Sequence, residues 1–174
     1  MDYNAVLTPY SEDKSVNVVV EIPKGSMHKV EYDRHMKLMR LDRVEPGIFA
    51  KPCNYGFIPG TLDDDGDELD VLLVTEEPLV TGLVVDATVL GVLEFEDDGE
   101  MDHKVICVPS DDRHTDNCIT SLEDLGSRWQ QMIEHHFTHY KDLKKPGSTK
   151  VLGFGDADKA HEVIAECIER WNNQ

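Results

Sequence analysis

The chain concentrates its carboxylates in two short segments. Its 174 residues carry 35 Asp and Glu against 17 Lys and Arg, which gives a net charge of -18 at pH 7. Residues 63–70 read DDDGDELD and residues 94–102 read EFEDDGEMD. Crowded carboxylates repel one another unless cations neutralise them, and their oxygens are the ligands that select hard ions such as Mg²⁺, Mn²⁺ or Ca²⁺. The two segments therefore predict a metal site, with a solvated acidic loop as the simpler alternative.

A glycine in each segment can bring these carboxylates to one place. In a regular strand Asp65 and Asp67 would share a face while Asp70 pointed the other way, but Gly66 can turn the chain between them. In the second segment, Asp97 and Asp102 would likewise point to opposite faces of a regular strand, and Gly99 between them can turn the chain. We therefore expect the acids of both segments to converge.

A protein that only buffers calcium is one alternative. An EF-hand loop beginning at Asp63 would need Gly where Glu68 stands and a bidentate Glu where Val74 stands. Strand-like sequence also follows the loop where an EF-hand has a helix. The sequence disfavours this reading.

Cations and tyrosines complete a set that suits phosphate chemistry. Lys29 and Glu31 are two apart on an expected strand and share a face, with Val30 facing the core, and Lys104 shares the face of Asp102. The other candidate anion donors are Arg43, Tyr55, Tyr140 and Lys141. Divalent ions lower the pKa of bound water from 15.7 toward about 7, while cationic side chains stabilise the leaving group. These residue types predict a metal-dependent phosphoryl hydrolase.

Strands dominate the first part of the chain and helices the last part. Alternating and β-branched patterns predict strands at 16–22, 27–32, 37–43, 71–75, 83–95 and 103–108, and a shaped loop at 51–60 that runs into a short extended segment. Helical spacing predicts one helix from Ser121, with a Ser-x-x-Asp cap, to about Tyr140, and a second over 156–171. The fold class is α+β and mainly β, a small closed or nearly closed barrel with two helices packed outside, in a single domain over 1–174.

Charge and composition exclude several classes of protein. A charge of -18 repels nucleic acid, which disfavours an OB-type oligonucleotide binder, the second alternative. The first residues lack the basic and apolar regions that a signal peptide would have, so we do not expect secretion, and the longest apolar stretch, 78–95, contains Asp86 and Glu94. The four cysteines are widely spaced and we expect reduced thiols. We expect a soluble, cytoplasmic protein that does not bind membranes.

The sequence resembles the soluble family I inorganic pyrophosphatases, in order and along nearly the whole chain. The matching pieces are VVVEIPKGSMHKVEYD, LDRVEP, KPCNYGFIPGTLDDDGDELDVLL, GVLEFEDDGEMDHKVICVP and HHFTHYKDL. The most telling motif is D-G-D-x-x-D-V, at residues 65–71, preceded by N-Y-G-F-I-P. The resemblance implies a five-stranded closed barrel of OB type with helices outside. It also implies Mg²⁺-dependent hydrolysis of diphosphate to two orthophosphates, with three to four Mg²⁺ ions in each active site and Mn²⁺ or Zn²⁺ as possible substitutes.

Site residues follow from the resemblance by position. Asp65, Asp70 and Asp102 match ligands of the first metal, with Asp70 also reaching the second, and Asp67 matches the base that takes a proton from water. Asp97 joins Asp102 at a third metal, while Glu21 and Glu31 act on metals through water. The phosphate-binding residues would be Lys29, Arg43, Tyr55, Tyr140 and Lys141, with Lys104 as a supporting cation.

The chain departs from the usual pattern of this family at two positions, and it also carries a pair of histidines outside the expected site. Lys51 stands where bacterial members commonly have Tyr, which adds a charge that can face phosphate, and Asp98 stands where Glu is usual. His135 and His139 are one helical turn apart but fail the H-E-x-x-H zinc pattern. The resemblance places their helix at a subunit contact and implies a homo-oligomer, a hexamer.

Overall fold

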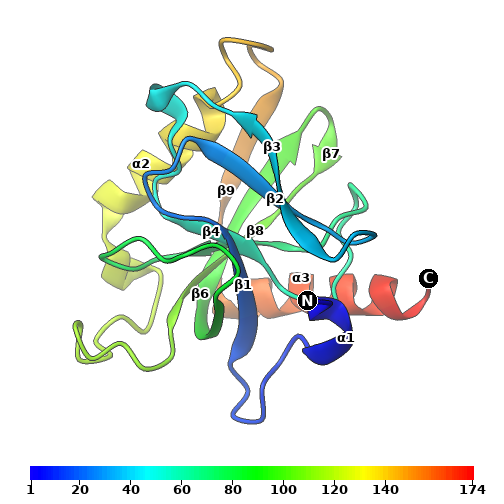
Figure 1. Ribbon diagram of the computed structural model, residues 1–174. Coiled ribbons are helices and arrows are strands. Elements are labelled where there is room, and N and C mark those ends of the chain that lie inside the picture. Colours follow the sequence, from blue (N-terminus) through cyan, green and yellow to red (C-terminus); the bar gives the residue numbers. More distant parts are fainter.

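The computed structural model describes all residues from 1 to 174 (Figure 1). The elements in chain order are α1 (Tyr3–Val6), β1 (Val16–Ile22), β2 (His28–Asp33), β3 (Leu38–Val44), η1 (Gly47–Phe49), β4 (Asn54–Phe57), β5 (Asp70–Leu73), β6 (Val84–Asp97), β7 (Glu100–Met101), β8 (Lys104–Pro109), η2 (Glu123–Leu125), α2 (Ser127–His139), β9 (Thr149–Asp156) and α3 (Ala157–Asn172). Strands therefore dominate and two long helices follow, which confirms the predicted mainly-β α+β class.

The predicted strands are present, and the predicted start of the first helix is wrong. Each strand expected up to residue 108 lies within two residues of its predicted bounds. The helix expected from Ser121 begins only at Ser127, because Gly126 has a φ of 78° and separates it from the 3-10 turn η2. Asp124 caps that short turn by accepting hydrogen bonds from the backbone of Thr120 and Ser121. The strand β9 was not predicted.

The main sheet has seven strands, and their pairing turns back on itself. The order is β1-β4-β5-β8-β6-β7, with β9 paired to β6, and β6 also pairs with β1. Only β5 and β8 run parallel among these pairs, so the sheet is mixed. Gly56 of β4 permits the close approach of β1, since a Cβ there would lie 2.0 Å from the carbonyl oxygen of Val19.

Both faces of this sheet are buried against apolar side chains. Along β5, Val71 and Leu73 belong to a cluster with the buried face of α3, whereas Leu72 belongs to a second cluster with Ile133 and Phe137 of α2. This two-sided burial explains why the strands read as continuous apolar runs. Asp156 is the N-cap of α3, and its carboxylate accepts a hydrogen bond of 2.9 Å from the backbone amide of Lys159.

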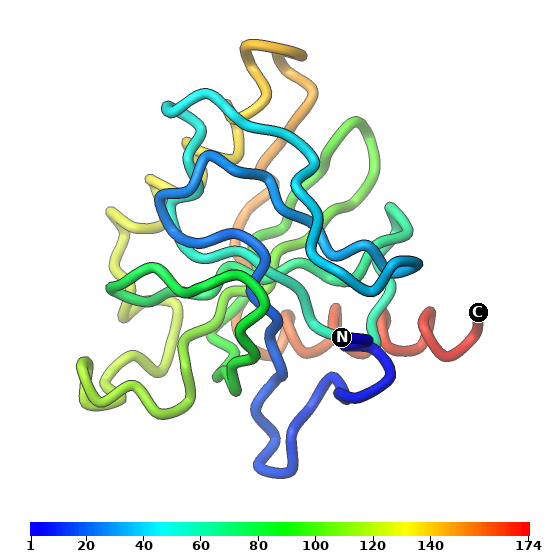
Figure 2. The backbone as a smooth tube through the Cα atoms, viewed as in Figure 1, coloured from blue at the N-terminus to red at the C-terminus, as the bar shows by residue number.

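The hairpin of β2 and β3 stands apart from the main sheet. These two strands pair only with each other, and in Figure 1 they pass in front of the sheet. In the backbone trace, the segment that follows β8, at about 110–120, extends away from the sheet at the lower left (Figure 2). No helix has the length and apolar character needed to span a bilayer.

Candidate active site

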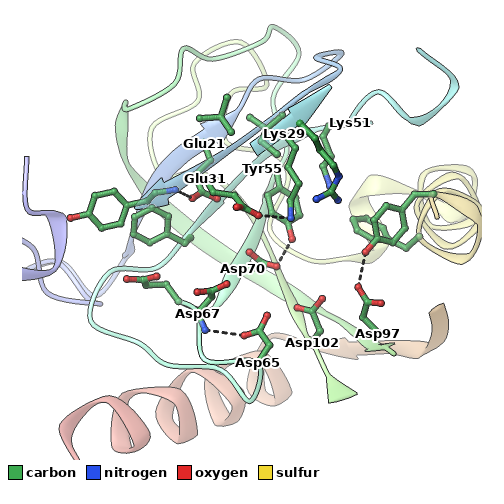
Figure 3. A pocket seen from close by; sticks show the side chains of 18 of the residues that line it. Glu21, Lys29, Glu31, Lys51, Tyr55, Asp65, Asp67, Asp70, Asp97 and Asp102 are labelled. Carbon is green, nitrogen blue, oxygen red and sulfur yellow. Dashed lines mark hydrogen bonds and ion pairs between the residues drawn. The ribbon is translucent and has the colours of Figure 1, made fainter. Parts of the chain in front are cut away.

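One cavity of about 250 Å³ brings together acids, cations and tyrosines from distant parts of the chain. Every residue predicted for the site lines it except Lys104, which lies behind the wall. Figure 3 shows Asp65, Asp67, Asp97 and Asp102 on one side, with Lys29 and Lys51 opposite. The predicted residues that line the cavity are Glu21, Lys29, Glu31, Arg43, Tyr55, Asp65, Asp67, Asp70, Asp97, Asp102, Tyr140 and Lys141.

The acidic loop 63–70 is a turn built around Gly66. Gly66 has a φ of 90°, in the left-handed region, and its amide donates to the carbonyl of Asp63 over 3.1 Å. The amide of Asp67 donates to the side chain of Asp65 over 3.0 Å. The turn lets Asp65, Asp67 and Asp70 line one cavity, as the glycine predicted.

Two arginines that the sequence did not single out hold this loop. Arg170 of α3 donates from Nε to the carbonyl of Leu62 over 2.9 Å, and it also contacts both acids that start the loop. Arg34 donates to the side chain of Glu68 over 2.9 Å and to the carbonyl of Gly66 over 3.1 Å. The loop is therefore fixed from α3 on one side and from the β2–β3 hairpin on the other.

Lys104 joins the carboxylates of Asp70 and Asp102. Its side chain is only 2% exposed, and its ammonium lies 2.5 Å from Asp70 and also donates to Asp102. Tyr55 donates its hydroxyl to Asp70. Burial alone would lower the pKa of Lys104, but the two carboxylates outweigh it and raise that pKa. Burial, with Asp70 nearby, raises the pKa of Asp102.

The second acidic segment is a hairpin between β6 and β7. Asp98 and Gly99 both have positive φ, and this tight turn leaves Asp97 facing the cavity. The carboxylate of Asp97 accepts a hydrogen bond of 2.9 Å from the hydroxyl of Tyr140 and pairs with Lys141. Its other oxygen is buried and has no partner. Asp98 pairs with Lys145, 2.5 Å away, and does not line the cavity.

The β2–β3 hairpin supplies the opposite wall. Lys29 pairs with Glu31 over 2.5 Å, which agrees with the shared face predicted for them. Val30 lines the cavity, whereas the sequence placed it in the core, because the strand has an irregularity in register between residues 29 and 30. Glu21 is buried and accepts a hydrogen bond of 2.6 Å from the amide of Tyr32. Burial, and then the nearby Asp70, raise the pKa of Glu21.

Asp67 differs from the other acids of the cavity. Its carboxylate accepts no hydrogen bond and pairs with no cation, although it lies at the open side of the cavity. Partial desolvation there, followed by the charge of Asp65, raises its pKa. A carboxylate with free lone pairs and a raised pKa is suited to accept a proton.

The cavity offers only oxygen donors to a metal. Its acids are carboxylates without a nearby Cys or His ligand, a set that suits Mg²⁺ or Mn²⁺. No three acidic, His or Cys side chains already have the spacing of a metal site. The reason lies in the pairs described above, since Lys104, Tyr55, Tyr140 and Lys141 hold the carboxylates of Asp70, Asp97 and Asp102. The partnerless oxygen of Asp97 fits a cation.

Comparisons with known proteins agree along the whole chain. A family model described as inorganic pyrophosphatase matches residues 18–172. The chain is 59% identical to "Inorganic pyrophosphatase" of Neisseria meningitidis serogroup B over 99% of this chain and 98% of the relative. It is 58% identical to the protein of the same name from Haemophilus influenzae, over 99% of each. A crystal structure of an inorganic pyrophosphatase from Neisseria gonorrhoeae superposes with a TM-score of 0.96 at 58% identity, over 98% of this chain and 99% of that one. The chain belongs to the inorganic pyrophosphatase family.

Proposed function

We propose that the chain is an enzyme that hydrolyses inorganic diphosphate to two orthophosphates with the help of divalent cations. The observation that carries this proposal is the single cavity that places the aspartates of both acidic segments opposite Lys29 and Lys51. Diphosphate is small and highly charged, so it needs cations on several sides at once. Neither a calcium buffer nor an oligonucleotide binder needs such a set of facing groups, and family membership speaks against both.

The carboxylates would hold the metal ions. Asp65, Asp70 and Asp102 are the proposed ligands of a first ion, Asp70 also reaches a second, and Asp97 with Asp102 holds a third. Glu21 and Glu31 are proposed to act through water. We propose Mg²⁺ as the ion, three to four in each site, with Mn²⁺ or Zn²⁺ as possible substitutes. When bound, these ions neutralise phosphate charge and lower the pKa of water.

The protein side chains have two roles in this proposal, to accept a proton and to bind the phosphate groups. Asp67 accepts the proton of the attacking water, a role supported by its free lone pairs and raised pKa. The hydroxyls and cations orient the two phosphate groups and stabilise charge on the leaving phosphate, through Lys29, Arg43, Tyr55, Tyr140 and Lys141. Lys104 is a positioning residue, because it holds Asp70 and Asp102 in place.

The finer features of the fold and assembly belong to the same proposal. We propose a five-stranded closed barrel of OB type, made of β1, β4, β5, β8 and β6, and the pairing of β6 back to β1 supports it. The whole of 1–174 is proposed as one domain. A cytoplasmic homo-hexamer is proposed, and the exposed His135 and His139, with rings 4.7 Å apart on α2, are candidates for a subunit contact.

Phosphate release across substrates and metals tests this function. The wild-type protein should release phosphate from diphosphate with Mg²⁺, release none with EDTA, and act far more slowly on nucleotides or longer polyphosphates. Asp67→Asn should lower kcat by about 100-fold or more because it removes the base. The matched control is Asp111→Asn, which changes an exposed acid outside the cavity. Wild-type protein that releases no phosphate, or an Asp67→Asn variant as fast as the control, would overturn the proposal.

A further inference from the structure

Lys51 places its ammonium among three aromatic rings at the cavity. Its Nζ lies 4.2 Å from the ring centre of Tyr55, 5.4 Å from that of Tyr140 and 5.7 Å from that of Phe137. The side chain is half-buried and lines the cavity on the side of Lys29 (Figure 3). The rings fix the ammonium in position, since cations are attracted to aromatic faces at these distances.

Lys51 is the one cation of the cavity wall without an acid partner. The other three each pair with a carboxylate, in Lys29–Glu31, Arg43–Glu45 and Lys141–Asp97. The ammonium of Lys51 forms no ion pair and donates no hydrogen bond, and only the backbone amide of this residue donates, to the carbonyl of Ser26. An ammonium has three donors, and aromatic rings do not replace a charged acceptor. A fixed, partly desolvated ammonium with free donors is therefore prepared to bind an anion from outside the chain.

The neighbours of Lys51 indicate which anion that is. A small side pocket continues from the main cavity, and Lys51 shares it with Lys29, Arg43 and Tyr140. These three are the residues proposed above to bind phosphate groups. The aspartates of the two acidic segments lie on the opposite side, where metal ions are proposed to bind, whereas Glu21 and Glu31 lie beside Lys29 (Figure 3).

We propose that Lys51 is a further substrate-binding residue, whose ammonium donates to a phosphate oxygen of bound diphosphate. This inference rests on the proposed function. Because the cation is in place before substrate arrives, it stabilises bound substrate and transition state alike, and its loss should raise KM more than it lowers kcat. The rings of Tyr55 and Tyr140 position it between the two tyrosines whose hydroxyls face the metal side.

The test compares variants that separate charge from packing. Lys51→Met keeps the length of the side chain and removes its charge, and Lys51→Arg keeps the charge. Lys150→Met is the matched control, since it removes one exposed lysine of β9 that lines no part of the cavity. Steady-state hydrolysis of diphosphate with saturating Mg²⁺ gives kcat and KM. Calorimetric binding of methylenediphosphonate, which the enzyme cannot hydrolyse, gives affinity directly, and thermal unfolding reports the fold.

We expect Lys51→Met to raise KM by about 10- to 50-fold and to weaken binding of the analogue by a similar factor, the loss typical of a hydrogen bond to a charged group. The Tm should stay equal or rise, because an unpaired charge has been removed, and Lys51→Arg should restore most of the affinity. If Lys51→Met does not fold, Lys51→Gln takes its place.

A lowered Tm with unchanged KM and analogue affinity would show that Lys51 only packs against the rings, and would overturn the inference. Equal losses in Lys150→Met would also overturn it, since net charge would then explain the effect. If the wild-type protein released no phosphate at all, the proposed function would fail first, so the two failures are distinguishable.

Discussion

Replacing Lys104 by Met should destabilise the metal-free protein and make its stability depend more strongly on Mg²⁺. The change removes the ammonium that joins Asp70 and Asp102 and leaves two neighbouring carboxylates without a cation. Breaking a buried ion pair by removing one partner costs about 3–5 kcal/mol. The side chains of Asp70 and Asp102 remain 20% and 14% exposed, so water stabilises them in part. We therefore expect a loss at or somewhat below the lower end of this range, about 2–3 kcal/mol.

For a chain of this length that loss corresponds to a Tm lower by about 5–10 °C. The assay is thermal unfolding at pH 8, first in EDTA and then in excess Mg²⁺. Divalent ions that bind the same carboxylates replace the lost cation, so the gap between variant and wild type should narrow when Mg²⁺ is added. The Lys150→Met variant controls for the change in net charge.

Two results would refute this reasoning. A Lys104→Met variant as stable as the control in EDTA would mean that the buried pairs do not stabilise the fold. A difference in Tm between variant and wild type that is the same in EDTA and in Mg²⁺ would mean that the metals do not bind where Lys104 holds Asp70 and Asp102.

Three further predictions concern the elements that support the site. Phe137→Ala should lower the free energy of unfolding, measured by urea denaturation, by about 3–5 kcal/mol, because it leaves a cavity where α2 packs against the sheet. A loss below about 1 kcal/mol would contradict that packing. Arg170→Met should raise the Mg²⁺ concentration needed for half-maximal activity by about 3- to 10-fold, because α3 then no longer holds the acidic loop 63–70. Arg113→Met, at an exposed arginine, should leave that concentration unchanged. Equal effects of the two changes would refute the role of Arg170 in fixing the loop. Burial lowers the pKa of His136 to about 4, so the unfolded chain binds a proton that the folded chain does not between pH 6.5 and 4. Stability should therefore fall as pH drops through this window, and His136→Phe should remove about 3 kcal/mol of the fall in unfolding free energy between pH 6.5 and 4. An unchanged dependence of unfolding free energy on pH would contradict the assignment.

The sequence predicted those parts of the site that depend on local chain geometry. Gly66 and Gly99 mark turns in which a positive φ is required, and both turns orient carboxylates toward the cavity. The start of α3 was also readable, because Asp156 caps it through a contact three residues away. The fold class followed from the order of strands and helices.

Features that depend on tertiary contacts could not be predicted in this way. The helix α2 starts late because Gly126 interrupts a pattern whose apolar spacing continues through Leu122 and Leu125 into η2. The strand β9 contains two glycines and a mixed burial pattern, so it lacks the alternation of an ordinary strand. Nothing local to Arg170 reveals the loop that it contacts, because Leu62 lies far along the chain. Of the rings around Lys51, Tyr55 is close in sequence, but Phe137 and Tyr140 come from the far end of the chain.

The most direct measurement is a crystal structure of the protein grown with Mn²⁺, with anomalous diffraction to locate the metal. The central claim is that the two acidic segments together bind hard cations on one side of a cavity that receives diphosphate. The account predicts anomalous peaks within about 2.1–2.3 Å of carboxylate oxygens of Asp65, Asp70 and Asp102. Peaks elsewhere on the surface, with these three carboxylates still bound only to Lys104, Tyr55, the amide of Asp67 and solvent, would contradict it.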